Sequence, residues 1–242
     1  MRETVDILGV GIDKITAEYA LRKAERYVRT PGVSVIYTPN PEIIMAAYES
    51  DAFKKVLNSA DMCTPDGIGV VYASRMLHSP VPERVAGFDL ACGVLESISK
   101  TGESVFLFGA KPGVAETAAE KLKVKYPGLV IAGTHDGYFK EEDEDAIVQQ
   151  INDSGASLLF VCLGAPKQEN WIYRNRDRLK VNLCMGIGGA LDVFAGNVKR
   201  APKIFIKCNL EWLYRFCKQP SRLGRFAALP KFMNIVRKKI SK

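Results

Sequence analysis

Residues 156–164 read ASLLFVCLG, a run of apolar side chains that a glycine closes. A half-exposed strand would alternate apolar and polar residues, whereas this run is apolar on both faces, which predicts a strand covered by helices on both sides of its sheet. Similar short runs alternate with longer amphipathic stretches along the chain. The expected strands are VDILGVGI (5–12), VSVIYT (33–38), ADMCT (60–64), SVFLFGA (104–110), GLVIAGT (128–134), ASLLFVCLG (156–164) and VNLCMGIGG (181–189).

The amphipathic stretches between the strands have the length and spacing of helices. They are TAEYALRKAERYVR (16–29), PEIIMAAYESDAFKKVLNS (41–59), GFDLACGVLESISK (87–100), VAETAAEKLKVKYP (114–127), EEDEDAIVQQINDSG (141–155) and PKQENWIYRNRDRL (166–179). Strands that alternate with helices predict an α/β protein with a doubly wound, mostly parallel sheet of the Rossmann-like kind.

Composition bounds the classes of protein that fit. With 242 residues and 47% hydrophobic content the chain can form one large domain, alone or with an appendage. The longest apolar run, LLFVCLGA (158–165), is far shorter than the roughly 18 residues of a membrane-spanning helix, and no signal peptide is recognised, so we expect a cytoplasmic protein. Six cysteines without a CxxC pair predict buried, reduced thiols. The two histidines lack neighbouring ligands, which disfavours metal and Ser-His chemistry.

Charge divides the chain into two unequal parts. Residues 195–242 contain 13 Lys or Arg and a single acid, Glu211, whereas the first 194 residues carry a net charge of −5. Because the basic residues are interleaved with apolar and aromatic ones, we predict an α/β domain over 1–195 and a helical, basic, partly amphipathic appendage over 196–242. Such an appendage is suited to dock on an anionic membrane surface.

Polar or glycine-rich segments follow the predicted strands. Each alone is readily explained as a turn, but the carboxyl ends of parallel strands meet at one edge of the sheet, where open α/β sheets bind their ligands. Six such segments therefore favour a binding site at that edge. They are TPNPE (38–42), TPDGIG (64–69), FGAKPG (108–113), THDGYF (134–139), LGAPKQE (163–169) and GIGGALD (186–192).

Two of these segments place side chains with little conformational freedom. In TPNPE the two prolines fix the backbone around Thr38 and Asn40, so these side chains project at low entropic cost. Asn40 is equally suited to cap a helix whose first residue is Pro41. Asp66 in TPDG precedes a glycine at a helix start, where it is either an N-cap or a carboxylate placed to accept a proton.

Two other motifs resemble cofactor or metal sites without matching them. GIGGAL (186–191) follows the last predicted strand, and its sixth residue is Leu191, whereas a dinucleotide fingerprint needs G-x-G-x-x-G after the first strand. We therefore expect these glycines to let the backbone approach a nucleotide base and sugar, and we disfavour a nicotinamide or flavin oxidoreductase. Asp143 and Asp145 open an acidic helix start, which suits the helix dipole better than a metal–diphosphate clamp. No cofactor and no metal are expected.

Motifs across nearly the whole chain resemble, in order and in spacing, the WecG/TagA/CpsF family of bacterial glycosyltransferases. The appendage, with EWLYR and QPSRLGR, is most similar to that of the TagA type. The motifs are TPNPEI, TPDGIGVV, ERVAGFDL, FLFGAKPGVAE, DGYF, LGAPKQENWI, GIGGALDVFAGNVKRAP and LEWLYRF. The resemblance implies an inverting glycosyltransferase. It would move N-acetylmannosamine from UDP-N-acetylmannosamine to the 4-hydroxyl of undecaprenyl-diphosphate-linked N-acetylglucosamine, in wall teichoic acid linkage-unit synthesis, and would invert the configuration of the anomeric carbon. A same-family donor such as UDP-ManNAcA is an alternative.

The resemblance also suggests roles for individual residues. Asp66 is expected to be the base, Thr38 to position the base or the sugar, and Arg84 to stabilise the leaving diphosphate, unless Arg84 merely pairs with Glu83 or Asp89. Tyr138 is a substrate contact or a core residue, and Gln168 a substrate contact or a helix cap. The remaining predicted substrate-binding residues are Asn40, Gly186, Gly188, Gly189, Asp192, Arg215, Arg222 and Arg225. The resemblance thus implies that the domain over 1–195 is catalytic and that the appendage over 196–242, with its three arginines, completes the active site.

The expected partners are a UDP-sugar donor, the lipid-linked acceptor and the inner face of the cell membrane, to which the enzyme would bind peripherally. A homo-oligomer is compatible with the resemblance. The aromatic and basic residues of the appendage also suit nucleic acid, but no known nucleic-acid-binding module accompanies them, so we disfavour that function.

Overall fold

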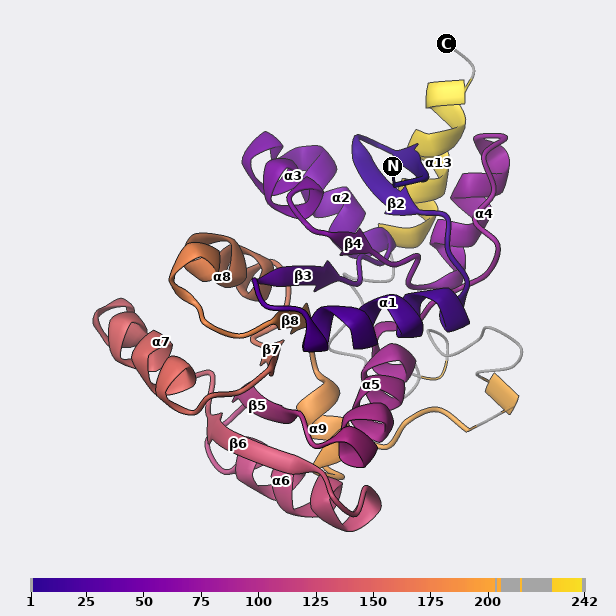
Figure 1. The fold of residues 1–242 in the computed structure, drawn as a ribbon. Helices are drawn as coiled ribbons and strands as arrows, with labels where there is room; N and C mark the ends of the chain where they lie inside the picture. The colour runs from indigo at the N-terminus through magenta and orange to yellow at the C-terminus, as the bar shows by residue number, and fades with distance from the viewer. Residues whose placement is uncertain (1, 203, 206–213, 215–227, 241–242) are drawn as a thin grey trace.

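The computed structural model describes residues 2–202, 204, 205, 214 and 228–240 (Figure 1). Within these residues a parallel sheet in the order β4-β3-β8-β7-β5-β6 is flanked by helices on both faces, which confirms the predicted α/β, Rossmann-like architecture. Its strands are β3 (Ser34–Tyr37), β4 (Met62–Cys63), β5 (Ser104–Gly109), β6 (Val130–His135), β7 (Leu158–Cys162) and β8 (Leu183–Gly186).

Each predicted stretch is helical, with one division, whereas α4 and α9 lie outside the predicted stretches. The segment predicted as one helix over 41–59 is two, because Ser50 ends α2 and its hydroxyl accepts a hydrogen bond from the Phe53 N–H at 3.3 Å to start α3. The helices are α1 (Ala17–Arg29), α2 (Pro41–Glu49), α3 (Asp51–Asn58), α4 (Ile68–Met76), α5 (Gly87–Thr101), α6 (Val114–Lys125), α7 (Glu144–Asp153), α8 (Lys167–Asn175), α9 (Ala190–Phe194) and α13 (Ala228–Ile240), with 3-10 turns at Glu141–Asp143 and Arg176–Arg178.

The first predicted strand is instead an antiparallel hairpin outside the main sheet. β1 (Thr4–Ile7) pairs with β2 (Val10–Asp13), and the turn between them places Leu8 and Gly9 at positive φ. Gly9 adopts this conformation without steric cost, and it allows the tight two-residue turn that a continuous strand cannot make. The prediction of a single strand over 5–12 was therefore wrong.

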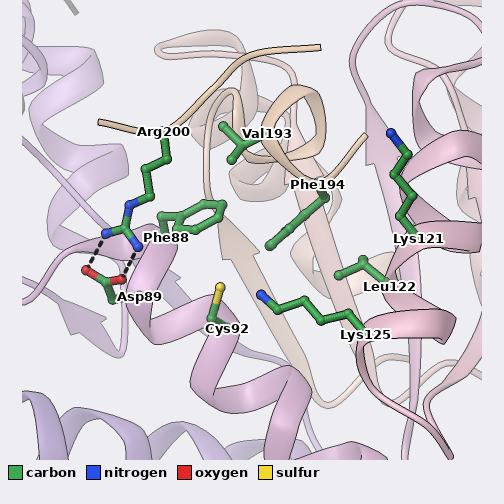
Figure 2. Close-up of a pocket in the computed structure, with 9 residues that line it drawn as sticks. All are labelled: Phe88, Asp89, Cys92, Lys121, Leu122, Lys125, Val193, Phe194 and Arg200. Atoms are coloured by element: carbon green, nitrogen blue, oxygen red, sulfur yellow. Dashed lines mark hydrogen bonds and ion pairs between the residues drawn. The ribbon is translucent and has the colours of Figure 1, made fainter. Parts of the chain in front are cut away.

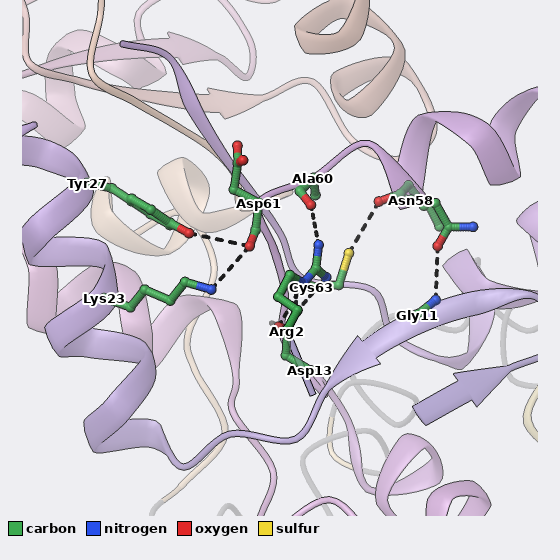
Figure 3. A network of polar contacts seen from close by, with 10 residues as sticks. Arg2, Gly11, Asp13, Lys23, Tyr27, Asn58, Ala60, Asp61 and Cys63 are labelled. Atoms are coloured by element: carbon green, nitrogen blue, oxygen red, sulfur yellow. Dashed lines mark hydrogen bonds and ion pairs between the residues drawn. The ribbon is translucent and has the colours of Figure 1, made fainter. Parts of the chain in front are cut away.

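A polar network fastens this hairpin to the domain (Figure 3). Arg2 and the buried Asp13 form two hydrogen bonds, of 2.9 and 2.7 Å, and Asp13 also accepts from the Cys63 N–H at 2.7 Å. Asn58 accepts from Gly11 N and donates to Gly9 O. Because the Asp13 carboxylate is both ion-paired and hydrogen-bonded, its burial is compensated.

Two hydrophobic cores lie on the two faces of the sheet. The hairpin, α2, α3, α4, α7, α8 and α13 contribute to one, and α1, α5, α6 and α9 to the other. Phe232 and Val236 of α13 are fully buried in the first core, so α13 packs on the α/β domain beside α2 and α4 (Figure 1). Ion pairs from Lys231 to Glu49 and from Lys239 to Asp6 add to this contact. The boundary at 195/196 stays a prediction.

The cysteines in the described part of the chain are free thiols, as predicted. Cys63, Cys162 and Cys184 are buried, and burial raises the pKa of each thiol to about 12. Cys92 is half-buried. Cys208 and Cys217 lie outside the described residues.

Candidate functional site

The chain diverges around the carboxyl end of β8. β8 continues through Ile187–Gly189 into α9 on one face of the sheet, while its neighbours β3 and β7 continue into α2 and α8 on the other face. Such a divergence opens a crevice beyond the strand ends, the usual ligand site of an open α/β sheet. The loop over 186–189, which we call the β8 loop or glycine loop, therefore lies where the segments predicted from sequence were expected to meet.

Thr38 joins the ends of β3 and β8. Its buried hydroxyl donates to the Gly186 carbonyl at 3.2 Å. The start of α5 packs against the same side chain, since a Cβ on Gly87 would lie 2.7 Å from the Thr38 methyl carbon. A glycine at position 87 thus allows the helix N-terminus to approach the strand ends.

Asp66 lies at the same helix start. The Gly87 N–H donates to the Asp66 carboxylate at 3.4 Å, and the Val85 N–H donates to the Pro65 carbonyl at 3.0 Å. Asp66 does not cap α4 as one alternative proposed, because the N-cap of α4 is Gly67, which has φ 87° and no side chain. A helix N-terminus is a favourable environment for a carboxylate, so the position suits an ionised base.

Asn40 is the N-cap of α2, as one of the two predictions for it required. Its side-chain oxygen accepts from the Ile43 N–H at 3.0 Å, and Pro41 is the first helical residue. The side-chain amide nitrogen is not used by this cap, so a substrate contact by Asn40 stays a prediction.

Gln168 holds the β8 loop from the α8 side. Its side chain is 2% exposed, its oxygen accepts from the Gly188 N–H at 3.0 Å, and its nitrogen donates to Glu169 at 2.8 Å. The N-cap of α8 is Pro166, so the alternative in which Gln168 caps this helix was wrong. Gly186 lies against the same amide: a Cβ on Gly186 would lie 3.1 Å from the Gln168 amide nitrogen.

Arg84 precedes α5, close in sequence to the Gly87–Asp66 contact. The two acids proposed as its ion-pair partners have other contacts: Glu83 accepts from the Ala17 N–H at 2.7 Å, and Asp89 pairs with Arg200 at 2.7 Å. Asp192 lies in α9 directly after the glycine loop, and its carbonyl accepts from the N–H groups of Asn197 and Val198. The catalytic and binding roles of Arg84 and Asp192 stay predictions.

Tyr138 lies beyond β6, at the edge of the sheet farthest from β3 and β4. Its side chain is 69% exposed, so the alternative that made it a core residue was wrong. β5 and β7 separate β6 from β8. A contact between Tyr138 and a nucleotide at the glycine loop therefore requires a ligand that extends along the strand ends.

A pocket of about 460 Å³ opens beside the site, between α5, α6 and α9 (Figure 2). Phe88 and Phe194 stack at 4.9 Å between ring centroids, and Arg200 contacts both the Phe88 ring and the Asp89 carboxylate. The contacts of Arg200 attach the start of the basic segment to the first turn of α5. The lining residues are Phe88, Asp89, Cys92, Lys121, Leu122, Lys125, Val193, Phe194 and Arg200.

Within the described residues, no group of three or more His, Cys, Asp or Glu side chains is arranged to hold a metal ion. Asp143 accepts from the Lys140 N–H at 3.0 Å, and Asp145 pairs with Arg178 at 2.6 Å. Asp143 and Asp145 thus make local contacts at the start of a helix, as their sequence context indicated. Arg215, Arg222 and Arg225 lie outside the described residues.

The burial of Glu169 was not predicted from sequence, although a signal for it was present. Residues 168, 169, 172 and 175 have the spacing of one helix face, and all four are buried. Gly87 was also missed as a contact of Thr38 and Asp66, because nothing in the sequence alone brings residue 87 to the strand ends that carry residues 38 and 66.

Residues 5–242 match the model of the Glycosyl transferase WecG/TagA/CpsF family, a class of enzymes that transfer sugars. The chain belongs to this family. Curated relatives share one name, N-acetylglucosaminyldiphosphoundecaprenol N-acetyl-beta-D-mannosaminyltransferase. The relative from Bacillus spizizenii is 40% identical, over 84% of this chain and 78% of its own length. The relative from Staphylococcus aureus is 37% identical, over 95% of this chain and 90% of its own length. The relative from Bacillus subtilis is 40% identical, over 82% of this chain and 77% of its own length.

Proposed function

We propose that this enzyme transfers N-acetylmannosamine, with inversion, from UDP-N-acetylmannosamine to the 4-hydroxyl of N-acetylglucosamine carried on undecaprenyl diphosphate. The name shared by the relatives supports this acceptor and this sugar. One geometric observation carries the assignment of the site: Thr38, Asp66 and the β8 loop meet around the N-terminus of α5. The product would serve the linkage unit of wall teichoic acid.

In the proposed reaction Asp66 accepts the proton of the acceptor's 4-hydroxyl group while the oxygen of that hydroxyl attacks the anomeric carbon of the donor sugar. The bond between that carbon and the UDP oxygen breaks on the opposite face of the sugar, which inverts the configuration. Negative charge develops on the departing diphosphate, where the Arg84 guanidinium and the N–H groups at the start of α5 would stabilise it. The glycine loop over 186–189 would receive the ribose and uracil.

We also propose that the protein binds peripherally to an anionic membrane, because the acceptor lipid stays in the bilayer. Among the described residues no helix is both long and apolar enough to cross a membrane. Lys231, Arg237, Lys238 and Lys239 of α13 are exposed, and each cation near an anionic surface contributes about 1 kcal/mol. Lys231 and Lys239 also pair with Glu49 and Asp6 of the domain, so the test uses Lys238. Sedimentation of full-length protein with phosphatidylglycerol vesicles, and loss of binding in a Lys238→Glu variant, would support this docking; equal binding to neutral vesicles would contradict it.

Nucleic-acid binding is less well supported. Stacking on bases needs exposed aromatic rings, whereas Phe232, one of the aromatic residues of the basic segment, is fully buried against the domain.

The deciding experiment measures UDP release with a synthetic lipid-diphosphate N-acetylglucosamine acceptor and three donors: UDP-N-acetylmannosamine, UDP-N-acetylglucosamine and UDP-ManNAcA. Acceptor-dependent release from the first donor alone is expected. Equal turnover of the donors, preference for UDP-ManNAcA, or no turnover at all would overturn the assignment.

A further inference from the structure

Gln168 and Glu169 form a buried relay at the start of α8. Their side chains are 2% and 1% exposed. The Gly188 N–H can only donate, so the Gln168 amide must turn its oxygen toward Gly188 and its nitrogen toward Glu169. The Glu169 carboxyl is thus the group that accepts a hydrogen bond from the nitrogen end of this amide.

Glu169 is an unusual residue to bury at this place. Its second carboxyl oxygen, Oε2, is buried and has no hydrogen-bond partner among the described residues. Burial raises the pKa of the Glu169 carboxyl, which favours its neutral form. An apolar side chain of similar size would avoid this desolvation cost, but it would leave the Gln168 amide nitrogen without the oxygen that accepts from it.

The relay ends on a loop that is held from two sides. Thr38, from β3, donates to the Gly186 carbonyl, and Gln168, from α8, accepts from the Gly188 N–H. Loss of either contact would free the loop at one end only. The orientation of the Gln168 amide therefore controls one of the two attachments of the loop.

We propose that Glu169 is a positioning residue for the β8 loop: its buried carboxyl group orients the Gln168 amide, which holds Gly188 where the loop meets the nucleotide of the donor. This inference rests on the proposed function, in which the loop binds that nucleotide. Glu169 itself touches neither the donor nor the acceptor in this proposal.

Two substitutions separate positioning from charge. Glu169→Gln keeps an acceptor oxygen and removes the ability to ionise, whereas Glu169→Met keeps the shape and removes the acceptor. Glu169→Met should weaken UDP binding and raise the donor KM by about tenfold, with a smaller change in kcat, and should speed hydrogen exchange at the Gly188 amide. Glu169→Gln should stay within about twofold of the unsubstituted protein on each measure.

A double-substitution cycle and a matched control complete the test. Gln168→Met should reproduce the loss, and adding Glu169→Met to it should cause no further loss, because both act through one hydrogen bond to the loop. The control is Glu144→Met: Glu144 accepts from Asn175 of the same helix, α8, at 2.9 Å but has no contact with the loop, so UDP affinity should not change.

Three results would overturn the inference: equal losses in Glu169→Gln and Glu169→Met, additive losses in the cycle, or unchanged Gly188 exchange in Glu169→Met. If the unsubstituted protein does not bind UDP, the proposed function fails instead. The exchange rate of the Gly188 amide then still decides whether Glu169 positions the loop, because that measurement needs no ligand.

Discussion

Two acids at the same edge of the sheet occupy opposite environments. Asp66, after β4, is half-buried and accepts from the N–H of Gly87 at a helix start, whereas Glu169, after β7, is buried with one oxygen lacking a described partner. The first environment favours a carboxylate and leaves it near the surface; the second favours a neutral carboxyl group. Carboxyl groups whose environments differ in this way commonly have different roles. The proposed roles, proton acceptance by Asp66 and loop positioning by Glu169, follow this difference.

The largest expected effect is on turnover, and it concerns Asp66. Asp66→Asn keeps an acceptor oxygen for Gly87 but removes the basic group, so kcat should fall by about 10² to 10⁴ while UDP affinity stays nearly unchanged. Steady-state kinetics and calorimetric UDP titration measure the two quantities. Asp51→Asn, which removes an exposed carboxylate paired with Lys54 in α3, is the matched control. Near-normal turnover in folded Asp66→Asn protein would remove the difference between the two acids.

A smaller loss of turnover is expected from substitution of Thr38, which connects the Asp66 side of the sheet edge to the glycine loop. Thr38→Val removes the hydroxyl that donates to Gly186 and keeps the branched shape against Gly87. Turnover should fall by about tenfold, and the free energy of unfolding by roughly 1 to 3 kcal/mol, because the buried carbonyl loses its donor. Thr101→Val, which removes an exposed hydroxyl from the far end of α5, should change neither. Unaltered donor kinetics in Thr38→Val would separate Thr38 from the site.

Much of this comparison was accessible from sequence. Apolar runs such as 156–164 predicted a parallel sheet, and in such a sheet the strand ends necessarily meet, so Thr38, Asp66 and the glycines of 186–189 could be assigned to one edge. The helix start at Pro41 and its Asn40 cap also follow local rules, and the structure confirms them.

What sequence could not supply are contacts between distant segments. One alternative made Asp66 the cap of the helix that directly follows it, yet its carboxylate accepts from the N-terminus of a helix 21 residues later. Leu8 and Gly9 turned an apparently continuous apolar strand into a hairpin, and Phe232 made part of the basic segment a core element. In each case tertiary packing decided between alternatives that local patterns left open.

A pH-dependent stability difference would sharpen the comparison from the Glu169 side. Because burial raises the pKa of Glu169 in the folded protein above the ordinary value of 4.5, the folded state binds its proton more tightly than the unfolded state. The stability contributed by the protonated carboxyl is thus full below pH 4.5 and is lost as the pH rises toward the folded-state pKa. Glu169→Gln has no such loss.

Relative to the unsubstituted protein, Glu169→Gln should therefore gain up to about 1.4 kcal/mol of unfolding free energy per pH unit over that window. Denaturant titrations at pH 4.5 and at successively higher pH values measure the difference. Glu120→Gln, on the exposed side of α6, reports the effect of removing one surface charge. A stability difference that does not change with pH would mean that Glu169 titrates like an exposed carboxyl.

The smallest expected effect is that of chelation, and it distinguishes a base from a metal ligand at Asp66. The Asp66 carboxylate accepts from Gly87, while the Asp143 and Asp145 carboxylates serve a helix start and an ion pair with Arg178. Arg84 and the N-terminus of α5 are the groups proposed to stabilise the departing diphosphate. Turnover in the presence of EDTA should therefore equal that of the untreated enzyme within error. UDP release is measured with the chelator present and again after the chelator has been removed. Full loss on chelation, restored by Mg²⁺ or Mn²⁺ in protein whose thermal unfolding midpoint is unchanged, would reassign Asp66 from proton acceptor to metal ligand.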